Sequence, residues 1–256
     1  MNSGLVSITF RQLSCEDIIN LVKQAGLQGI EWGGDVHVPH GNTARAAEVR
    51  KLTRDAGLSV SSYGSYYRSG EQNDFSFEDV LKTAGELSAP TIRVWAGRKG
   101  SEAADEAYRE AVVKDLRECA ETASRENIVL ALEYHGNTLT DTNESAARLV
   151  KEVSHSNLRL YWQTPGGTSF EYRKTGLEAA LPVLSNLHVF NWKHEDGKLV
   201  RLPLDQGEEE WMSYLSLAQT AEGDRWALIE FVTDNDPGNF LRDAATLNKW
   251  LERLEQ

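Results

Sequence analysis

The stretch Asn127-Ile128-Val129-Leu130-Ala131-Leu132-Glu133 decides the fold. It follows a helix-like segment, continues as an apolar run of strand length, and closes on an ionisable side chain. Similar phrases recur along the chain, at residues 5–10, 26–32, 57–63, 91–95, 157–163, 186–192 and 226–231. Short apolar strands that alternate with helices predict a parallel sheet, because parallel neighbours need a crossover connection.

Helix signals fill the segments between these phrases. Ser14 stands three residues before Asp17, which is close to a capping box, and Gly26 follows the same segment at the position where a helix ends. Residues 103–126 form a long amphipathic pattern, and Pro237 can begin the last helix because the first turn needs no N–H donor there.

Eight strand–helix units in 256 residues predict one closed, parallel eight-stranded (β/α)8 barrel, a TIM barrel of α/β class that occupies residues 1–256 as a single domain. The alternative is an open doubly wound sheet. That fold usually carries a glycine-rich loop after its first strand, and residues 9–14 contain no glycine.

The composition and charge of the chain restrict the classes of partner that it can bind. The net charge of −12 argues against a nucleic-acid backbone, which requires basic surface. No apolar run approaches the roughly 18 residues that span a bilayer, and the first residues lack the features of a signal peptide, so we expect a cytoplasmic protein with no membrane partner. Trp211 and Trp250 could lie at the interface of a homo-oligomer or pack helices on the barrel.

The ends of the predicted strands carry the candidate chemistry, because the site of a (β/α)8 barrel lies at the carboxyl ends of its strands. Glu133 and Glu230 each close an apolar run and should point over the mouth. Two such carboxylates could hold a divalent cation, act as acid and base, or do both. The alternative for each is a buried glutamate paired with an arginine.

Other polar and aromatic side chains follow the same strands. His188 lies within an apolar run and is either a satisfied core histidine or a ligand. Arg98 and Lys99 could meet a phosphate or form a solvated pair. The candidates for substrate contact are Glu31, Trp32, His37, Tyr63, Trp95, His135 and Lys193. Packing under loops is the alternative for the aromatic ones, and a solvated loop is the alternative for His37.

Four phrases resemble the xylose isomerase-like TIM barrels: residues 130–136, 160–165, 187–192 and 229–232. That superfamily contains sugar isomerases and ketose epimerases, inosose dehydratases and an endonuclease branch. The resemblance runs over nearly the whole chain and implies the barrel fold. This sequence lacks the larger His and carboxylate cluster of the endonuclease branch, and its charge is wrong for DNA.

The resemblance also implies a divalent metal, Mn, Mg or Zn, held by Glu, Asp, His and Glu on four successive strands. The matching positions are Glu133, Gln163, His188 and Glu230. Gln163 departs from the pattern, because an amide oxygen can ligate a hard cation but brings no charge. A metal-free isomerase, in which the two carboxylates work alone, would tolerate this change.

We therefore expect an isomerase or epimerase of a sugar, sugar phosphate or polyol ketone, with Glu133 and Glu230 as base and acid. The alternatives are an inosose-type dehydratase, which is a lyase, and a barrel that binds a carbohydrate without turning it over. Only the lyase would change the mass of its substrate.

Overall fold

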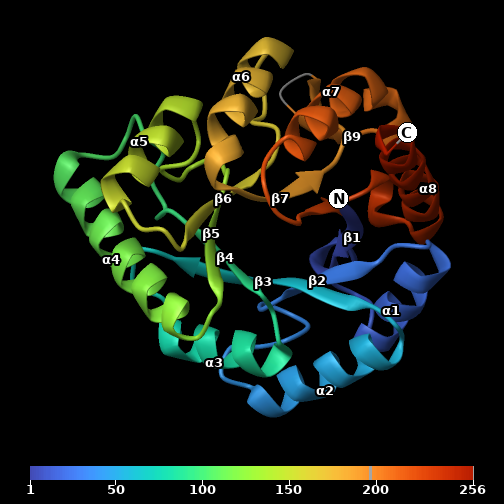
Figure 1. The fold of residues 1–256 in the computed structure, drawn as a ribbon, viewed down its shortest axis with the longest axis horizontal. Coiled ribbons are helices and arrows are strands. Elements are labelled where there is room, and N and C mark those ends of the chain that lie inside the picture. The colour runs from blue at the N-terminus through green and yellow to red at the C-terminus, as the bar shows by residue number, and fades with distance from the viewer. Residues whose placement is uncertain (196–197, 256) are drawn as a thin grey trace.

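The computed structural model describes residues 1–195 and 198–255 and shows a closed barrel of parallel strands surrounded by helices (Figure 1). The order around the barrel is β1-β10-β7-β6-β5-β4-β3-β2, which confirms the (β/α)8 prediction over the open sheet. The barrel strands are β1 (Asn2–Val6), β2 (Gly29–Gly33), β3 (Ser59–Arg68), β4 (Thr91–Trp95), β5 (Val129–Glu133), β6 (Leu158–Trp162), β7 (Leu184–Val189) and β10 (Trp226–Ile229).

The helices form an outer ring around these strands (Figure 1). They are α1 (Cys15–Gln24), α2 (Thr43–Asp55), α3 (Phe77–Leu87), α4 (Glu106–Arg125), α5 (Asn143–Val153), α6 (Phe170–Ala180), α7 (Glu208–Gln219) and α8 (Pro237–Leu254). Ser14 caps α1 through the backbone N–H of Asp17, and Gly26 follows that helix with φ +66°, as its sequence signals predicted.

Three segments differ from the prediction. The first strand ends at Val6, and residues 7–10 form a short 3-10 helix. Strand β3 continues beyond Tyr63 to Arg68. After β7 the chain forms an antiparallel hairpin of β8 (Trp192–Glu195) and β9 (Lys198–Arg201), which periodicity did not indicate because its strands are only four residues long.

The core divides into two parts. A large cluster fills the space between barrel and helices, and it includes Trp211 and Trp250, so both residues pack helices on the barrel. A small cluster fills the barrel interior and consists of Val6, Ile8, Ala131, Tyr161 and Leu228. These interior residues fix which side of each strand faces inward.

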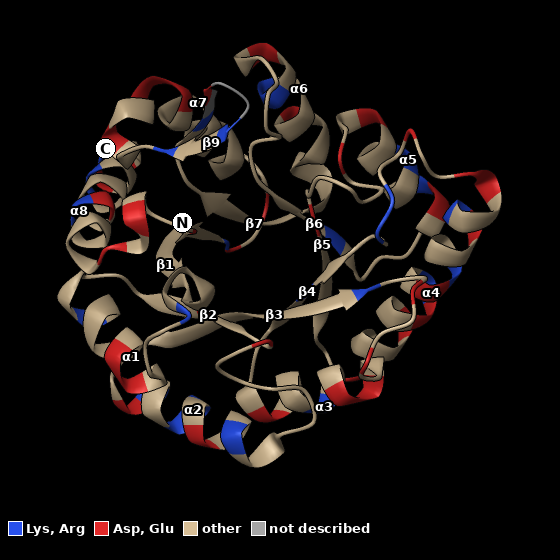
Figure 2. Ribbon diagram, turned by 180° about the vertical axis from the view of Figure 1, so that it is seen from behind, with Lys and Arg blue, Asp and Glu red and all other residues tan. Residues whose placement is uncertain are grey.

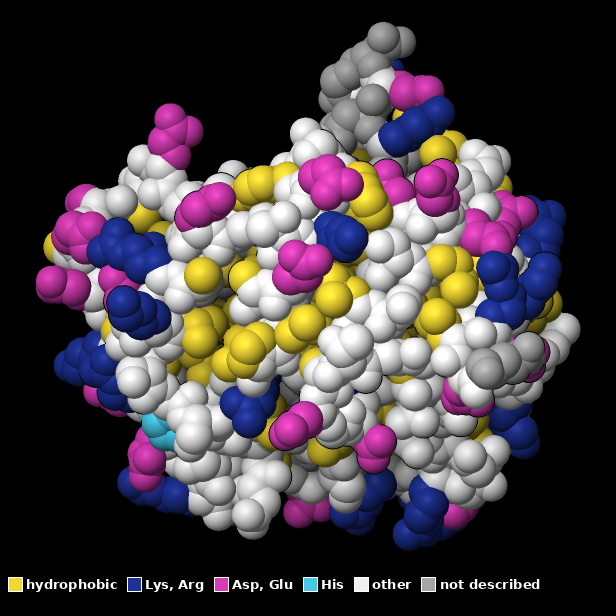
Figure 3. Space-filling model, turned by 45° about the horizontal axis from the view of Figure 1, so that its top comes forward, with side chains coloured by type: hydrophobic (Ala, Val, Ile, Leu, Met, Phe, Trp, Pro, Cys, Tyr) yellow, Lys and Arg dark blue, Asp and Glu magenta, His cyan; other side chains and the backbone are white. Residues whose placement is uncertain are grey.

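Two observations bear on the surface and the helices. Acidic and basic side chains are interspersed over the face in Figure 3, without a broad basic stripe. None of the described helices is long and apolar enough to cross a bilayer.

Candidate functional site

Alternate residues of each strand face the barrel interior, and this periodicity positions the side chains of the site. Ala131 and Leu228 belong to the interior cluster, so Glu133 and Glu230, two residues further on, also point inward. Tyr161 places Gln163 in the same way. The carboxyl ends of β5, β6, β7 and β10 thereby gather polar groups around His188, which is fully buried.

Glu133 is a heavily bonded carboxylate. It forms a buried ion pair with Arg93, accepts a hydrogen bond from Trp95 Nε1 at 2.5 Å, and accepts another from Gln163 Nε2 at 3.1 Å. Burial raises the pKa of Glu133. The positive charges of Arg93 and His188 lower it by more, so that the pKa falls to about 2. Glu133 is therefore held as an anion.

Glu31 lies one layer deeper in the barrel. It accepts hydrogen bonds from Arg93 Nε at 2.7 Å, Ser62 Oγ at 2.8 Å and Tyr161 OH at 2.5 Å. Burial raises the pKa of this carboxyl, and the Arg93 charge lowers it well below its usual range. Arg93 thus bridges Glu31 and Glu133, which satisfies an arginine that is 1% exposed.

His188 occupies the centre of the cluster. Its Nδ1 lies 3.2 Å from Gln163 Oε1, 3.4 Å from Glu230 Oε2 and 3.5 Å from Glu133 Oε1. Its Nε2 lies 3.6 Å from Glu31 Oε2 and has no hydrogen-bond partner among the described residues. Burial lowers the pKa of His188, but the surrounding carboxylates, Glu230 first, raise it to about 10.

Glu230 differs from Glu133 although both are buried. Among the described residues, His188 is the only cation within ion-pair distance of it, and no side chain donates a hydrogen bond to it. Burial and the Glu133 charge raise the pKa of Glu230, His188 lowers it, and the result is about 7. Glu230 is therefore the carboxyl in the cluster that can change its protonation near neutral pH.

The cluster also fits a divalent cation. Glu133, His188 and Glu230 each offer one ligand atom, and these atoms lie within 4.8 Å of one another. The Gln163 amide nitrogen must face the Tyr134 carbonyl, 2.5 Å away, so the amide oxygen points at His188 Nδ1 and into the same space. A metal or a proton can occupy Nδ1, but not both.

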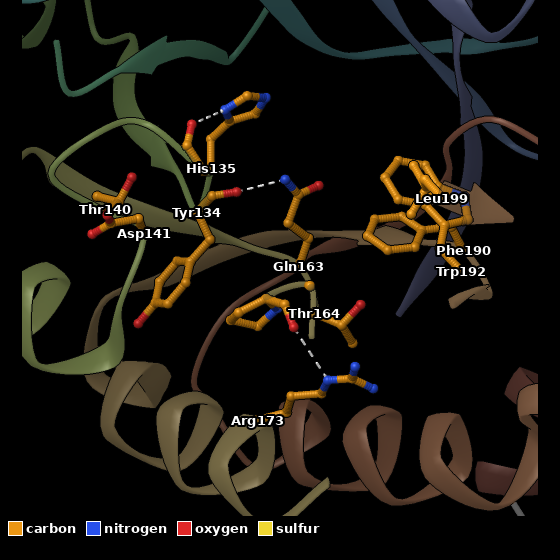
Figure 4. Close-up of a pocket in the computed structure, with 13 residues that line it drawn as sticks. Tyr134, His135, Thr140, Asp141, Gln163, Thr164, Arg173, Phe190, Trp192 and Leu199 are labelled. Atoms are coloured by element: carbon orange, nitrogen blue, oxygen red, sulfur yellow. Dashed lines mark hydrogen bonds between the residues drawn. The ribbon is translucent and has the colours of Figure 1, made fainter. Parts of the chain in front are cut away.

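A cavity of about 430 Å³ opens beside this cluster (Figure 4). Tyr134, His135, Gln163, Phe190 and Trp192 line it. The rings of Phe190 and Trp192 stack at 3.8 Å, and Figure 4 shows them on the side of the cavity opposite Tyr134. The cavity has the size and the aromatic walls of a small-ligand site.

The structure brings some of the predicted contact residues together. Trp95 stands at the end of β4 against Glu133, and the ring of His135 lies 4.7 Å from that of Trp95. Glu31 is fully buried beneath His188, so it supports the site from below and has no surface for a substrate. Lys193 lies on the exposed hairpin, where it pairs with Glu195 and lines a second cavity that shares Phe190 and Trp192 with the first.

Three of the predicted contact residues point away from the mouth. Glu31 and Ser62 face inward, so their neighbours Trp32 and Tyr63 face outward, where Trp32 Nε1 donates to Thr53 in α2 and Tyr63 OH donates to the Val38 carbonyl. Both side chains are fully buried. His37 is 4% exposed and packs on Trp32. These positions correct the expected substrate contacts, because two adjacent strand residues cannot both face the barrel interior.

Sequence reasoning passed over Arg93 and Tyr161. A charged residue inside the apolar run 91–95, two positions before Trp95, was the available signal for Arg93. The arginine partner considered as an alternative for Glu133 is this residue. It does not remove Glu133 from the cluster, because the other carboxylate oxygen still faces His188.

The chain is similar to several known proteins. A curated 3-dehydroshikimate dehydratase of Bacillus anthracis is 31% identical over 170 residues, which are 62% of this chain and 60% of that protein. Among solved structures, a probable 3-DHS dehydratase from Bacillus anthracis has a TM-score of 0.81 at 22% identity, covering 97% of this chain and 99% of that one. A xylose isomerase-like TIM barrel protein from Mycobacterium smegmatis in complex with magnesium has a TM-score of 0.77 at 17% identity, covering 99% and 97%.

The family model described as xylose isomerase-like TIM barrel matches residues 19–254, which include every strand-end residue of the cluster. This chain therefore belongs to the xylose isomerase-like TIM barrel family.

Proposed function

We propose that the protein is a lyase that dehydrates a small cyclic hydroxy ketone, with 3-dehydroshikimate as the first substrate to test. The observation that carries the proposal is the unequal pair of buried carboxylates beside an aromatic-walled cavity, in a chain 31% identical over 170 residues to a 3-dehydroshikimate dehydratase. The curated relative favours the lyase over the isomerase or epimerase, although both reactions begin by removing a proton next to a carbonyl.

The first step assigns Glu230 as the base. Its carboxylate accepts the proton from the carbon next to the ketone, and the C–H electron pair becomes the enolate. Glu133 cannot do this equally well, because Arg93, Trp95 and Gln163 already occupy its oxygens. Glu133, His188 and Glu230 would hold a divalent cation through one atom each, with Gln163 Oε1 as a neutral oxygen ligand, and the second oxygen of Glu230 would remain for the proton. The cation would supply Lewis-acid chemistry at the substrate oxygen.

The second step assigns His135 as the acid. Its Nδ1 faces the Gly136 carbonyl at 2.7 Å, which leaves Nε2 for the cavity that this residue lines. The enolate electrons expel the β-hydroxyl, the C–O bond breaks, and His135 donates the proton that makes the leaving group water. His135 donates this proton as an imidazolium and regains one from solvent, while Glu230 releases its proton to solvent, so the net change is the loss of one water.

The test is incubation of the purified protein with 3-dehydroshikimate, and separately with a panel of free and phosphorylated ketoses, with Mg²⁺, Mn²⁺, Zn²⁺ or a chelator. We expect a product lighter by one water from the cyclic ketone and unchanged masses from the ketoses. A ketose isomer of unchanged mass would instead assign the same glutamates to an isomerase. No conversion under any condition would favour a binding protein without turnover.

A further inference from the structure

Three basic side chains gather on the rim between β3 and β4. Arg68 ends β3, where the ribbon in Figure 2 is coloured for a basic residue, and Arg98 and Lys99 follow β4. The Arg68 guanidinium carbon lies 3.9 Å from the centre of the Trp95 ring, and its Nη1 donates to the Gly97 carbonyl at 3.0 Å. Arg68 is thereby held in one orientation against the loop that carries the other two cations.

The same loop is fixed from its other side. Tyr108 OH accepts hydrogen bonds from the backbone N–H groups of Arg98 at 2.6 Å and Lys99 at 3.3 Å, and Lys99 Nζ lies 4.5 Å from the centre of the Tyr108 ring. The Tyr108 hydroxyl donates to Glu71 at 2.5 Å. The nearby carboxylate of Glu71 is thus engaged by a tyrosine, without an ion pair to the cations.

The positive charge of this basic rim is only partly balanced by nearby carboxylates among the described residues. None of its three cations forms an ion pair among the described residues, whereas Arg11, which donates to Tyr66 OH, pairs with Asp35. Burial lowers the pKa of Arg68 and the charge of Arg98 lowers it further, whereas the charges of Glu71 and Glu133 raise it; the net direction is down. Three basic residues without an ion pair are unexpected in a chain with 39 acidic and 27 basic residues.

Trp95 connects the basic rim to the carboxylate cluster. One face of its ring carries Arg68, and its Nε1 donates to Glu133 at 2.5 Å. The ring of Tyr66 meets that of Trp95 edge-on at 5.1 Å and helps to fix it. An anion on Arg68 would therefore lie beside the indole that contacts both Glu133 and the ring of His135, at 4.7 Å between ring centres.

We propose that Arg68, Arg98 and Lys99 bind a carboxylate carried by the substrate. This inference rests on the proposed function and narrows it to cyclic keto acids. A guanidinium presents parallel N–H groups that match the two oxygens of a carboxylate, and the stacking on Trp95 orients those groups before the ligand arrives. The carboxylate of the substrate would then lie at the basic rim, with its ketone toward the cluster.

The kinetic test compares Arg68→Met, Arg98→Gln and the double variant, with Arg159→Gln as the matched control. Methionine keeps apolar contact with Trp95 but removes the charge. Arg159 is also an arginine without an ion pair among the described residues, and it lies by a cavity at the opposite end of the barrel, beside Pro90 and Trp226. With 3-dehydroshikimate, we expect KM to rise about 10- to 100-fold in the rim variants while kcat changes less than about threefold. An unchanged KM in the double variant would overturn the proposal.

A binding test separates the basic rim from the proposed reaction. The wild-type protein and the double variant are titrated with cyclohexanecarboxylate, its uncharged amide and inorganic phosphate, and the indole N–H signals are followed by NMR. We expect the carboxylate alone to shift a tryptophan signal that Trp95→Phe removes, and we expect the double variant to lose that shift. This result would support the carboxylate site even if 3-dehydroshikimate were not converted. Equal responses to the amide, or a response to phosphate alone, would overturn it.

Discussion

Glu133 and Glu230 end equivalent strands, are both at most 5% exposed, and face the same histidine, yet their surroundings are opposite. Glu133 receives hydrogen bonds from a tryptophan and an amide and an ion pair from a buried arginine. Glu230 has His188 as its only ion-pair partner among the described residues. Two identical side chains at the rim of one barrel are thereby given different tasks by their neighbours.

The difference follows from the strands on either side of each glutamate. β5 lies next to β4, which supplies Arg93 and Trp95 on one face, so Glu133 gains donors on that side. β10 lies between β7 and β1, and no charged partner comes from β1, whose residues near the rim are apolar. Glu133 is thereby held as an anion, whereas Glu230 can gain or lose a proton near neutral pH, as the proposed base must do.

The largest expected effect is on turnover, from Glu230→Gln. The substitution keeps the size of the side chain and removes its basicity, so we expect kcat to fall about 10²- to 10⁴-fold with the fold intact. Thermal unfolding should be unchanged or slightly higher, because a poorly paired buried charge has been removed. Kinetic and melting measurements on the same preparation test the fall in kcat and the unchanged stability. A large loss of stability would mean that Glu230 is a structural anion like Glu133.

The next effect is on stability, from Glu133→Gln. This change leaves Arg93 with Glu31 as its only carboxylate partner within 4 Å among the described residues, so we expect the free energy of unfolding to fall by about 3–5 kcal/mol. Urea denaturation measures it. The Glu133→Gln/Arg93→Met double variant should recover part of the loss, since the buried charge is then gone. If the double variant were as unstable as the sum of the single ones, the ion pair would not explain the difference between the glutamates.

Gln163→Asp tests whether the two glutamates and His188 share a metal with residue 163. A third carboxylate should raise the affinity of the cluster for Mn²⁺ about tenfold or more, as calorimetry with the apo protein would show. The same change removes the amide donor to Glu133 and places an anion near the Tyr134 carbonyl, so the metal-free variant should melt at a lower temperature than wild type. Unchanged affinity would indicate that Gln163 does not face the ion.

Much of this arrangement could be predicted from the sequence, because barrel strands and helix caps are encoded locally. Ser14, Gly26 and the apolar runs predicted the elements, and strand ends predicted the glutamates. The sequence did not predict which residues of a strand face the barrel interior and which face the helices. The strands are apolar on both faces, so polar and apolar residues do not alternate along them. Trp32 and Tyr63 were therefore expected at the mouth.

The ion-pair network was also beyond local reasoning. Glu31, Arg93 and Tyr161 come from three strands, and only the closed barrel brings their side chains into contact. The hairpin of β8 and β9 was hidden for a different reason, since two strands of four residues with charged side chains resemble a loop.

Asp243 provides a smaller reference effect outside the site. This buried carboxyl accepts one hydrogen bond, from the Leu204 N–H at 2.9 Å, and burial raises its pKa to about 6. Because the folded pKa exceeds the unfolded value of about 3.8, its contribution to stability is present below about pH 4 and is lost as the pH rises through 6.

Asp243→Asn keeps the hydrogen bond and removes the titration. We therefore expect the variant to be about 1–2 kcal/mol more stable than wild type at pH 7.5 and equal to it at pH 3.5. Denaturation curves at the two pH values measure this difference. A constant difference at both pH values would show that burial with a single donor does not shift a carboxyl in this fold, which would also weaken the interpretation of Glu230.

The most direct measurement is proton exchange at carbon in D₂O. Wild type, Glu230→Gln and Asp243→Asn are incubated with 3-dehydroshikimate and Mn²⁺, and mass spectrometry follows both water loss and deuterium in the remaining substrate. We predict water loss with wild type and Asp243→Asn, and neither water loss nor deuterium incorporation with Glu230→Gln. Water loss at the wild-type rate in Glu230→Gln would contradict the assignment of the base.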